Sequence, residues 1–181
     1  MKENINVKDL QFEMFIHAEK ISERIAELGE VITNFYGDEK PVIVPVLNGS
    51  FIFAADLIRK IDLDCEISFV KFSSYAHTQS TGNIKELIGL NENFAGKKVL
   101  IIEDIVDTGR TMQHLLAKIW ALNAADIRIA TLLFKKEMLV CDVNPDFVGF
   151  EIPNRFVVGY GLDYDGYGRH YDAIYAKSDN V

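Results

Sequence analysis

The sequence predicts an α/β fold in which helices flank a central, mostly parallel sheet. Patterns typical of strands and helices alternate across residues 41–134, which indicates a parallel sheet with right-handed crossovers. Residues 99–102 are consecutive aliphatic side chains, as expected of a strand that is buried on both faces. The 181 residues are 49% hydrophobic and 11% aromatic, which allows a sizeable core and excludes a disordered chain.

The first predicted elements are a long helix and a strand–turn–helix unit. A helix over residues 12–35, ended by Gly37, follows from apolar side chains spaced three and four apart: Ile21, Ile25, Leu28, Ile32 and Phe35. Residues 41–47 predict a buried strand, in which Pro45 indicates an edge or a bend because it lacks a backbone donor. A turn and a helix over residues 51–61 complete the unit.

Three more strands are predicted before residue 135. Residues 65–75 and 85–90 are expected to be strands, and residues 126–134 another buried strand. The polar residues 76–83 favour a passive connector when taken alone, with a mobile lid as the alternative.

After Phe134 the chain becomes rich in aromatic residues and in turns. Short extended pieces are expected at residues 147–150, 156–158 and 173–175, separated by Pro, Asn and Gly. Two interpretations are open. The segment forms a small satellite core, or it forms a hood that holds a planar ligand against the carboxyl edge of the sheet, where open α/β sheets bind ligands.

Charge and cysteine content restrict the partners. The formal net charge of −8 argues against nucleic acid or an anionic membrane surface as a main partner. Cys65 and Cys141 lie among apolar residues outside any metal-ligand spacing, which indicates reduced core thiols. The N-terminus is polar, and no apolar run approaches the length of a bilayer span. We therefore expect a cytoplasmic protein.

Residues 98–112 are the most informative stretch. The apolar run leads to the small turn DTGRT at residues 107–111, and a helical pattern then extends to about Leu122. The first N–H groups of a helix are unpaired and carry the positive end of its dipole, so a phosphate placed there gains several hydrogen bonds. Gly109 permits close backbone approach. A simple Asp/Thr helix cap would explain the triplet DTG alone, whereas the whole string favours an anion site.

Two adjacent acids, Glu103 and Asp104, are expected at the end of the strand that precedes this turn. Carboxylates repel a phosphate, but they suit ribose hydroxyls or a magnesium ion with its waters. Together with the turn, they predict a site for a sugar phosphate.

Five motifs then carry a resemblance to a known family. They are PVLNGSFIFAADL, SSYAHTQSTGNIK, VLIIEDIVDTGRTM, LLFKKE and PDFVGFEIPNRFVVGYGLDYDGYGR, and they extend from about residue 41 to 175. Their types and order resemble the type I phosphoribosyltransferase family, in particular its hypoxanthine-guanine branch. The resemblance implies the type I phosphoribosyltransferase fold in one domain, residues 1–181, with a core at about 35–135 and a hood built from the N-terminal segment and about 136–181.

The resemblance also implies an activity and its partners. The enzyme would move the 5-phosphoribosyl group from phosphoribosyl pyrophosphate to N9 of a 6-oxopurine, hypoxanthine and/or guanine, and form IMP or GMP and pyrophosphate in purine salvage. Mg²⁺ is the implied cofactor, and a homodimer or homotetramer is the implied assembly.

Site residues follow from the resemblance by matching position. Those implied for the 5′-phosphate are Asp107, Thr108, Gly109, Arg110 and Thr111, and those for ribose are Glu103 and Asp104. Those implied for pyrophosphate are Leu47, Asn48, Gly49, Ser74, Tyr75 and Arg169, with the loop at 73–83 as a lid. Those implied for the purine are Lys135, Phe156, Val157 and Asp163. The implied magnesium ligands are Glu103, Asp104 and Asp163, and the implied catalytic base is Asp107.

The chain departs from the family pattern at one notable position. Asn48 stands where relatives often have lysine, so any side-chain charge from that position is missing. Arg110 stands where some relatives have lysine, which is a milder change because both side chains are cationic donors. Three alternatives remain open, namely a xanthine-preferring transferase, a regulator that keeps the fold and binds nucleic acid, and a purely structural α/β domain.

Overall fold

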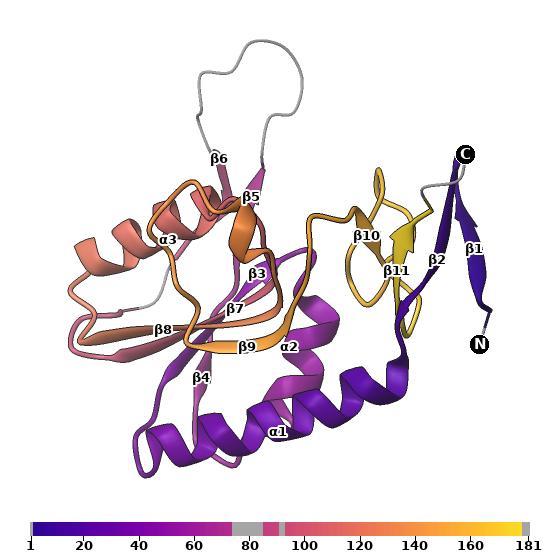
Figure 1. Ribbon diagram of the computed structural model, residues 1–181. Helices are drawn as coiled ribbons and strands as arrows, with labels where there is room; N and C mark the ends of the chain where they lie inside the picture. The colour runs from indigo at the N-terminus through magenta and orange to yellow at the C-terminus, as the bar shows by residue number, and fades with distance from the viewer. Residues whose placement is uncertain (1, 74–84, 91–92, 179–181) are drawn as a thin grey trace.

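The computed structural model describes residues 2–73, 85–90 and 93–178, which form a larger and a smaller sheet with three α-helices (Figure 1). In chain order the elements are β1 (Asn4–Val7), β2 (Leu10–Ile16), α1 (Ala18–Tyr36), β3 (Val42–Leu47), α2 (Phe51–Ile58), β4 (Glu66–Ile67), β5 (Val70–Ser73), β6 (Lys85–Ile88), β7 (Lys98–Val106), α3 (Arg110–Ala121), β8 (Asp126–Phe134), the 3₁₀ helix η1 (Lys136–Met138), β9 (Phe147–Glu151), β10 (Val157–Val158) and β11 (Ile174–Lys177).

The larger sheet has the strand order β6-β5-β3-β7-β8-β9, and β4 also pairs with β3. Neighbouring strands run parallel except β5 and β6, which are antiparallel. In the middle of the sheet, Val99 of β7 lies opposite Val42 of β3 and Ile127 of β8. The predicted α/β fold with a mostly parallel central sheet is confirmed.

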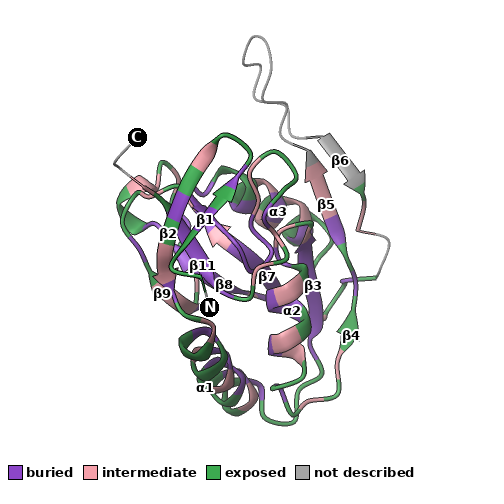
Figure 2. Cartoon of the chain, turned by 90° about the vertical axis from the view of Figure 1, so that its right-hand side faces the viewer, coloured by how far each residue is buried: buried purple, intermediate pink, exposed green. Residues whose placement is uncertain are grey.

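Helices cover both faces of this sheet, which explains why the β7 sequence is apolar without alternation. Leu100 and Ile102 pack in one cluster with α1 and α2, whereas Val99 and Ile101 pack in a second cluster with α3. All four side chains are fully buried, each at a gain of about 1.5–3 kcal/mol over exposure, and β7 and β8 are mostly purple in Figure 2. In the described ranges, no helix is long and apolar enough to cross a membrane.

A smaller antiparallel sheet, of order β1-β2-β11-β10, brings the two ends of the chain together (Figure 1). The helix predicted over residues 12–35 therefore begins too early, because residues up to Ile16 belong to β2 and α1 begins at Ala18. Along β2, Phe12 is buried in the core of this small sheet, while Gln11 and Glu13 on either side are exposed. That alternation is the period of a strand.

Three further fold expectations are corrected. Tyr36 rather than Phe35 faces the core, with 3% against 49% exposure. Pro45 lies in the central strand β3; β4 pairs with the beginning of β3 and β5 with its end, so the missing donor of Pro45 falls between them. Cys65 and Cys141 are free, but both are only partly buried at the margins of the core clusters.

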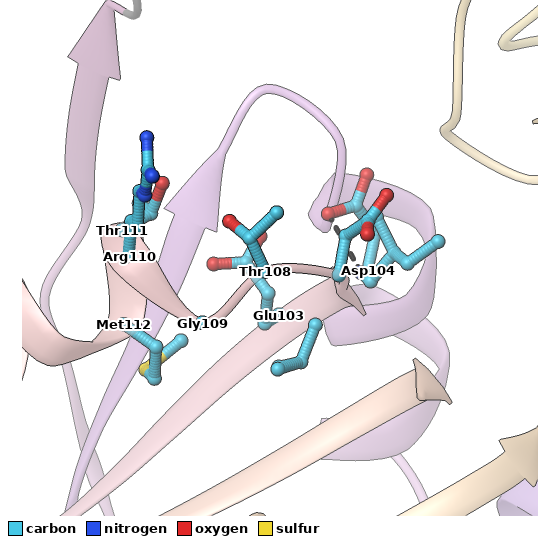
Figure 3. A pocket seen from close by; sticks show the side chains of 10 residues that line it. Glu103, Asp104, Thr108, Gly109, Arg110, Thr111 and Met112 are labelled. Atoms are coloured by element: carbon cyan, nitrogen blue, oxygen red, sulfur yellow. Dashed lines mark hydrogen bonds between the residues drawn. The ribbon is translucent and has the colours of Figure 1, made fainter. Parts of the chain in front are cut away.

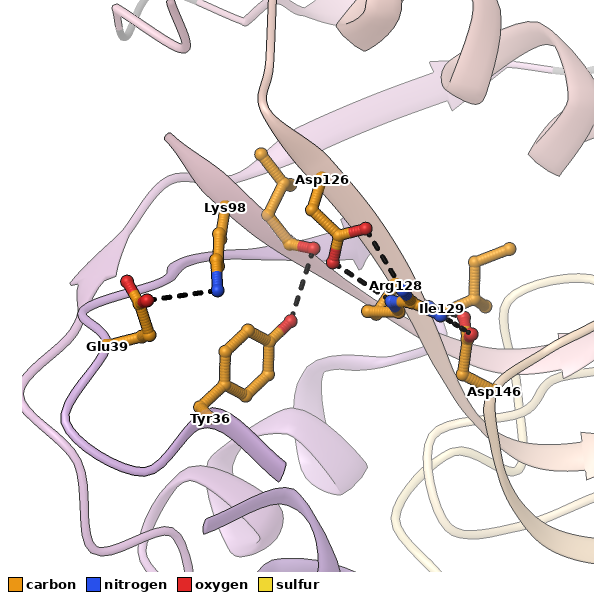
Figure 4. A network of polar contacts seen from close by, with 8 residues as sticks. Tyr36, Glu39, Lys98, Asp126, Arg128, Ile129 and Asp146 are labelled. Atoms are coloured by element: carbon orange, nitrogen blue, oxygen red, sulfur yellow. Dashed lines mark hydrogen bonds and ion pairs between the residues drawn. The ribbon is translucent and has the colours of Figure 1, made fainter. Parts of the chain in front are cut away.

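A polar network joins the amino ends of β7 and β8 to α1 (Figure 4). The hydroxyl of Tyr36 donates to the carbonyl of Val99 at 3.4 Å. Arg128 donates to both carboxylate oxygens of Asp126, at 2.9 and 3.1 Å, and to Asp146 at 2.9 Å. The carboxyl ends of the same strands, at the opposite edge, remain available for a ligand site.

Candidate active site

The carboxyl end of β7 carries two buried acids. Glu103 and Asp104 were expected at the end of the strand, but β7 continues to Val106 and both acids lie inside it, each 9% exposed. The strand is longer because β8 pairs with it up to Val106. The two acids, the following turn and the beginning of α3 line a pocket of about 190 Å³ (Figure 3).

The turn after β7 depends on Gly109. Its φ of 81° is in the left-handed region, and a Cβ there would lie 3.2 Å from the side chain of Leu139. α3 begins at Arg110, and Gly109 accepts the N–H of Gln113 at 2.8 Å. The N–H groups of the first helical turn have no partner within the helix, so this end of the pocket suits an anion.

Burial governs the charge state of the two acids. Burial, and then the neighbouring Asp104, raises the pKa of Glu103 well above its usual value. Burial also raises the pKa of Asp104. This rise is opposed in part by the hydrogen bond with Glu103, by the hydrogen bond from the N–H of Ile105 at 3.0 Å and by the charge of Arg169. Ionising both acids therefore costs free energy unless hydroxyl donors or a cation face them.

This donor pair fits a magnesium ion, because a divalent cation would stabilise the two ionised carboxylates and take its other oxygens from substrate and water. In the part of the chain that the structure describes, no three His, Cys, Asp or Glu side chains are grouped to hold a metal. The predicted ligand Asp163 is instead bonded to Arg169 at 2.6 Å and to the N–H of Gly166 at 2.6 Å. The buried pair and Asp163 thus do not form one ligand group.

The turn at the end of β3 packs directly on Asp104. The Leu47–Asn48 peptide bond is cis. Gly49 lies so close that a Cβ on it would overlap the carboxylate of Asp104. Ser50 is fully buried, and its hydroxyl donates to the carbonyl of Val46 at 2.7 Å. The predicted pyrophosphate turn therefore lies beside the predicted ribose-binding acids.

The loop between β10 and β11 reaches the same turn from the smaller sheet. A Cβ on Gly161 would overlap the carbonyl of Gly49, so the two backbones are in contact. The guanidinium group of Arg169 donates a hydrogen bond to the carbonyl of Gly161 at 2.5 Å. In return, the N–H of Gly161 donates to the main-chain carbonyl of Arg169 at 2.9 Å. The structure thus brings Arg169 to the side of the turn that holds Leu47, Asn48 and Gly49.

Lys135 follows β8 and is joined to the turn after β7. Its ammonium group donates to the carboxylate of Asp107 at 2.8 Å, and its N–H donates to the carbonyl of Val106 at 3.0 Å. Lys135 is only 6% exposed, whereas the Asp107 side chain is 42% exposed. A buried cation and a more exposed carboxylate therefore meet next to the turn that precedes α3.

Val157 begins strand β10 of the smaller sheet, and Phe156 directly precedes it. Phe156 is 44% exposed, and its ring meets Tyr164 edge-on at 5.7 Å and Phe12 at 6.0 Å. Val157 is buried in β10 opposite Ala176. An exposed aromatic face backed by other rings is the geometry that stacking on a planar ligand requires.

Two predicted site residues, Ser74 and Tyr75, lie outside the described residues, as does most of the predicted lid. Sequence reasoning also missed pocket residues. Ile105 and Met112 line the pocket beside the acids and the turn. Both have the spacing of core residues in a strand and a helix, and nothing in their chemistry distinguished them.

Comparisons with known proteins agree with this geometry. A family model described as a phosphoribosyl transferase domain matches residues 13–165. The hypoxanthine-guanine phosphoribosyltransferase of Lactococcus lactis is 40% identical over 153 residues, 84% of this chain and 83% of that protein. The hypoxanthine-guanine phosphoribosyltransferase of Bacillus subtilis is 43% identical over 152 residues, 83% of this chain and 84% of that protein.

A solved structure agrees as well. The crystal structure of a hypoxanthine-guanine phosphoribosyltransferase from Bacillus anthracis superimposes with a TM-score of 0.86 at 38% identity, covering 91% of this chain and 97% of that one. The resemblance inferred from the five motifs, and the type I fold that it implied, are confirmed. The family match spans the larger sheet and every element of the pocket, so this chain belongs to the phosphoribosyltransferase family.

Proposed function

We propose that the protein transfers the 5-phosphoribosyl group of phosphoribosyl pyrophosphate to N9 of hypoxanthine or guanine, forming IMP or GMP and pyrophosphate in purine salvage. The observation that carries the proposal is the ion pair of Lys135 with Asp107 at 2.8 Å. This ion pair holds the ammonium group of Lys135, a donor suited to a purine carbonyl, beside the turn at residues 107–111, which is suited to a phosphate. The names of the relatives from Lactococcus lactis and Bacillus subtilis support the same activity.

The sugar phosphate would lie along the end of β7. The helix N-terminus at Asp107, Thr108, Gly109, Arg110 and Thr111 would hold the 5′-phosphate through N–H and hydroxyl donors. Glu103 and Asp104 would accept hydrogen bonds from the ribose hydroxyls, directly or through Mg²⁺ and its waters. Hydroxyl donors of this kind would offset the cost of ionising the buried pair.

The purine would lie between Lys135 and the smaller sheet. An ammonium group has three N–H donors, so Lys135 can bond to Asp107 and to the 6-oxo group together. Adenine offers an amino group there, leaves the buried lysine unsatisfied and should be rejected. The exposed ring of Phe156 would stack on the purine, and the main chain of Val157 and of the Asp163 region would face its 2-position.

In the chemical step, the bond from C1 of ribose to pyrophosphate breaks while N9 of the purine bonds to C1. The proton on N7 of the purine would pass to the carboxylate of Asp107, which lies 2.8 Å from the ammonium group of Lys135. C1 becomes oxocarbenium-like, and enclosure of the site would keep water from capturing it.

The pyrophosphate would leave between the turn at Leu47, Asn48 and Gly49 and the side chain of Arg169, with Ser74 and Tyr75 above it. Mg²⁺, held by Glu103, Asp104 or Asp163, would neutralise charge on the departing group. Asn48 offers amide donors where a lysine would add charge, so the cationic side chain proposed here is Arg169.

We further propose that residues 1–181 act as one domain, with the core at about 35–135 and a hood from both ends. The chain would work in the cytoplasm as a homodimer or homotetramer. Light scattering of the purified protein tests the assembly, and a monomer at micromolar concentration would count against it.

A substrate panel tests the activity. Purified protein, phosphoribosyl pyrophosphate and Mg²⁺ are combined with hypoxanthine, guanine, xanthine or adenine, and nucleotide formation is followed by absorbance. We expect turnover of hypoxanthine or guanine and none of adenine. Preferential turnover of xanthine would identify the alternative transferase, and no turnover of any oxopurine would exclude the proposed enzyme.

A further inference from the structure

Tyr160 joins the smaller sheet to α2 at a point away from the substrate pocket. Its hydroxyl donates to the carboxylate of Asp56, which also pairs with Arg59. These three residues line a separate surface pocket of about 530 Å³, and none of them lines the pocket of Glu103 and its neighbours. The contact between Tyr160 and Asp56 can therefore affect a ligand in the pocket of Glu103 only through other residues.

The backbone at Tyr160 is held in an unusual conformation. Its φ is 49°, between Gly159 at 100° and Gly161 at 99°, so three consecutive residues are left-handed. Tyrosine adopts this region at a cost that glycine does not have, and surrounding contacts must hold it. The N–H of Tyr160 donates to the carbonyl of Tyr171 at 2.8 Å, and the side chain is 7% exposed. Burial, with the bond to Asp56, raises the pKa of Tyr160.

The residue after Tyr160 contacts both proposed pyrophosphate elements. Gly161 packs against the carbonyl of Gly49, and its own carbonyl accepts a hydrogen bond from Arg169 at 2.5 Å. The position of Gly161 thus fixes Arg169 relative to the turn at the end of β3.

Asp56 provides the other end of this connection. It lies in α2, which begins at Phe51 directly after the turn containing Gly49 (Figure 1). The turn and Tyr160 are therefore attached to the same helix, the turn through the chain and Tyr160 through its hydroxyl.

We propose that Tyr160 and Asp56 are positioning residues that hold Arg169 and the Gly49 turn at the spacing that pyrophosphate requires. The inference rests on the proposed function, because it assigns pyrophosphate to these two elements. It adds a contact between α2 and the loop after β10, on which affinity for phosphoribosyl pyrophosphate depends. The purine contacts at Lys135 and Phe156 do not depend on this contact.

The test is Tyr160→Phe, which removes only the hydroxyl. We expect the KM for phosphoribosyl pyrophosphate and the Kd for Mg²⁺-pyrophosphate to rise about tenfold, the order expected from losing one hydrogen bond to a charged acceptor. The KM for hypoxanthine should stay within about twofold, because the purine contacts at Lys135 and Phe156 do not involve the Tyr160 hydroxyl. Tyr175→Phe is the matched control, because it removes a hydroxyl of the smaller sheet that bonds to the carbonyl of Lys2 at 3.2 Å.

Two variants of Asp56 separate positioning from general loss of stability. Asp56→Asn keeps an oxygen that accepts the Tyr160 hydroxyl, so it should restore most of the affinity that Asp56→Ala loses. Asp56→Ala combined with Tyr160→Phe should be no worse than either alone, because both remove the same contact. Melting temperatures of all variants show whether each is folded.

Several outcomes would overturn the inference. They are an unchanged pyrophosphate Kd in Tyr160→Phe, an equal rise in Tyr175→Phe, or equal rises in the KM of both substrates. Calorimetric binding of Mg²⁺-pyrophosphate does not require turnover. If the wild type binds pyrophosphate but converts no oxopurine, the proposed function alone fails, and the Kd comparison still decides the role of Tyr160. If the wild type converts oxopurines and Tyr160→Phe is unchanged, only this inference fails.

Discussion

Lys135→Met tests the assignment of purine recognition. The variant keeps the length of the side chain and removes its donors, so the 6-oxo group of the purine loses a hydrogen bond from a charged group. Such a bond contributes about 1.5–3 kcal/mol, which corresponds to roughly a 10- to 100-fold loss of kcat/KM for hypoxanthine. Discrimination against adenine should fall, because the buried donor that adenine leaves unsatisfied is gone.

The same change should leave the fold intact. Lys135 is 6% exposed, and its partner Asp107 retains 42% exposure of its side chain and so stays hydrated without the lysine. A methionine occupies the buried position without an ionic charge to desolvate. We therefore expect the free energy of unfolding to change by less than about 1 kcal/mol.

Steady-state kinetics with each purine and urea unfolding measure the two quantities. Lys136→Met is the matched control, because Lys136 is the adjacent lysine and is exposed. The reasoning is refuted if both variants lose the same kcat/KM, or if Lys135→Met loses activity only in proportion to its unfolding.

Three further predictions address charge, packing and the distant network. Glu103→Gln should raise the melting temperature at pH 7 while lowering activity. Because the pKa of Glu103 is raised in the folded state, the stability of the wild type falls as the pH rises from the ordinary carboxyl pKa toward the folded value. The gain in melting temperature should therefore vanish near pH 4 in a calorimetric series, and a gain that persists there would contradict the prediction. Gly49→Ala should raise the KM for phosphoribosyl pyrophosphate by about tenfold or more, because its Cβ would overlap the carboxylate of Asp104; an unchanged KM would contradict this. Arg128→Ala should lower the free energy of unfolding, measured in urea, by about 1–3 kcal/mol, because the hydrogen bonds of Arg128 to Asp126 are lost. The kcat of the folded variant should be unchanged, since Asp126 lies at the amino end of β8, at the opposite edge of the sheet from the pocket. A loss of kcat in folded Arg128→Ala would argue against that separation.

The β7 strand, its turn and α3 could be predicted because their determinants are local. Four aliphatic residues mark a strand covered on both faces, and Gly109 marks the left-handed position before the helix. The end of the strand could not be located, since Glu103 and Asp104 have the polarity of a loop. Pairing with β8 extends β7 past them, and that pairing depends on residues some thirty positions away.

The strand at residues 10–16 could not be separated from α1 by spacing. Phe12 and Ile16 are four apart, which fits a helix as well as the alternation of a strand. The deciding partner of β2 is β11, at the other end of the chain. Pro45 was misplaced for a similar reason, since its position is tolerated only because β4 and β5 share one side of β3.

Within the site, residue types could be predicted but not their mutual contacts. The sequence motifs indicated Asp107 and Lys135 separately, and the ion pair between them appears only once β7 and β8 lie side by side. The contact between Gly161 and Gly49 joins the loop after β10 to the turn after β3, and no periodicity in the chain indicates it.

The central claim is that Asp107 takes the purine proton at the junction of the phosphate turn and the purine site. The most direct measurement is the kcat and the hypoxanthine KM of Asp107→Asn, which keeps the shape of the side chain and removes the base. We expect kcat to fall by about 10²- to 10⁴-fold, the usual contribution of a general base, with a much smaller change in KM. Equal losses in turnover and in purine binding would contradict the assignment.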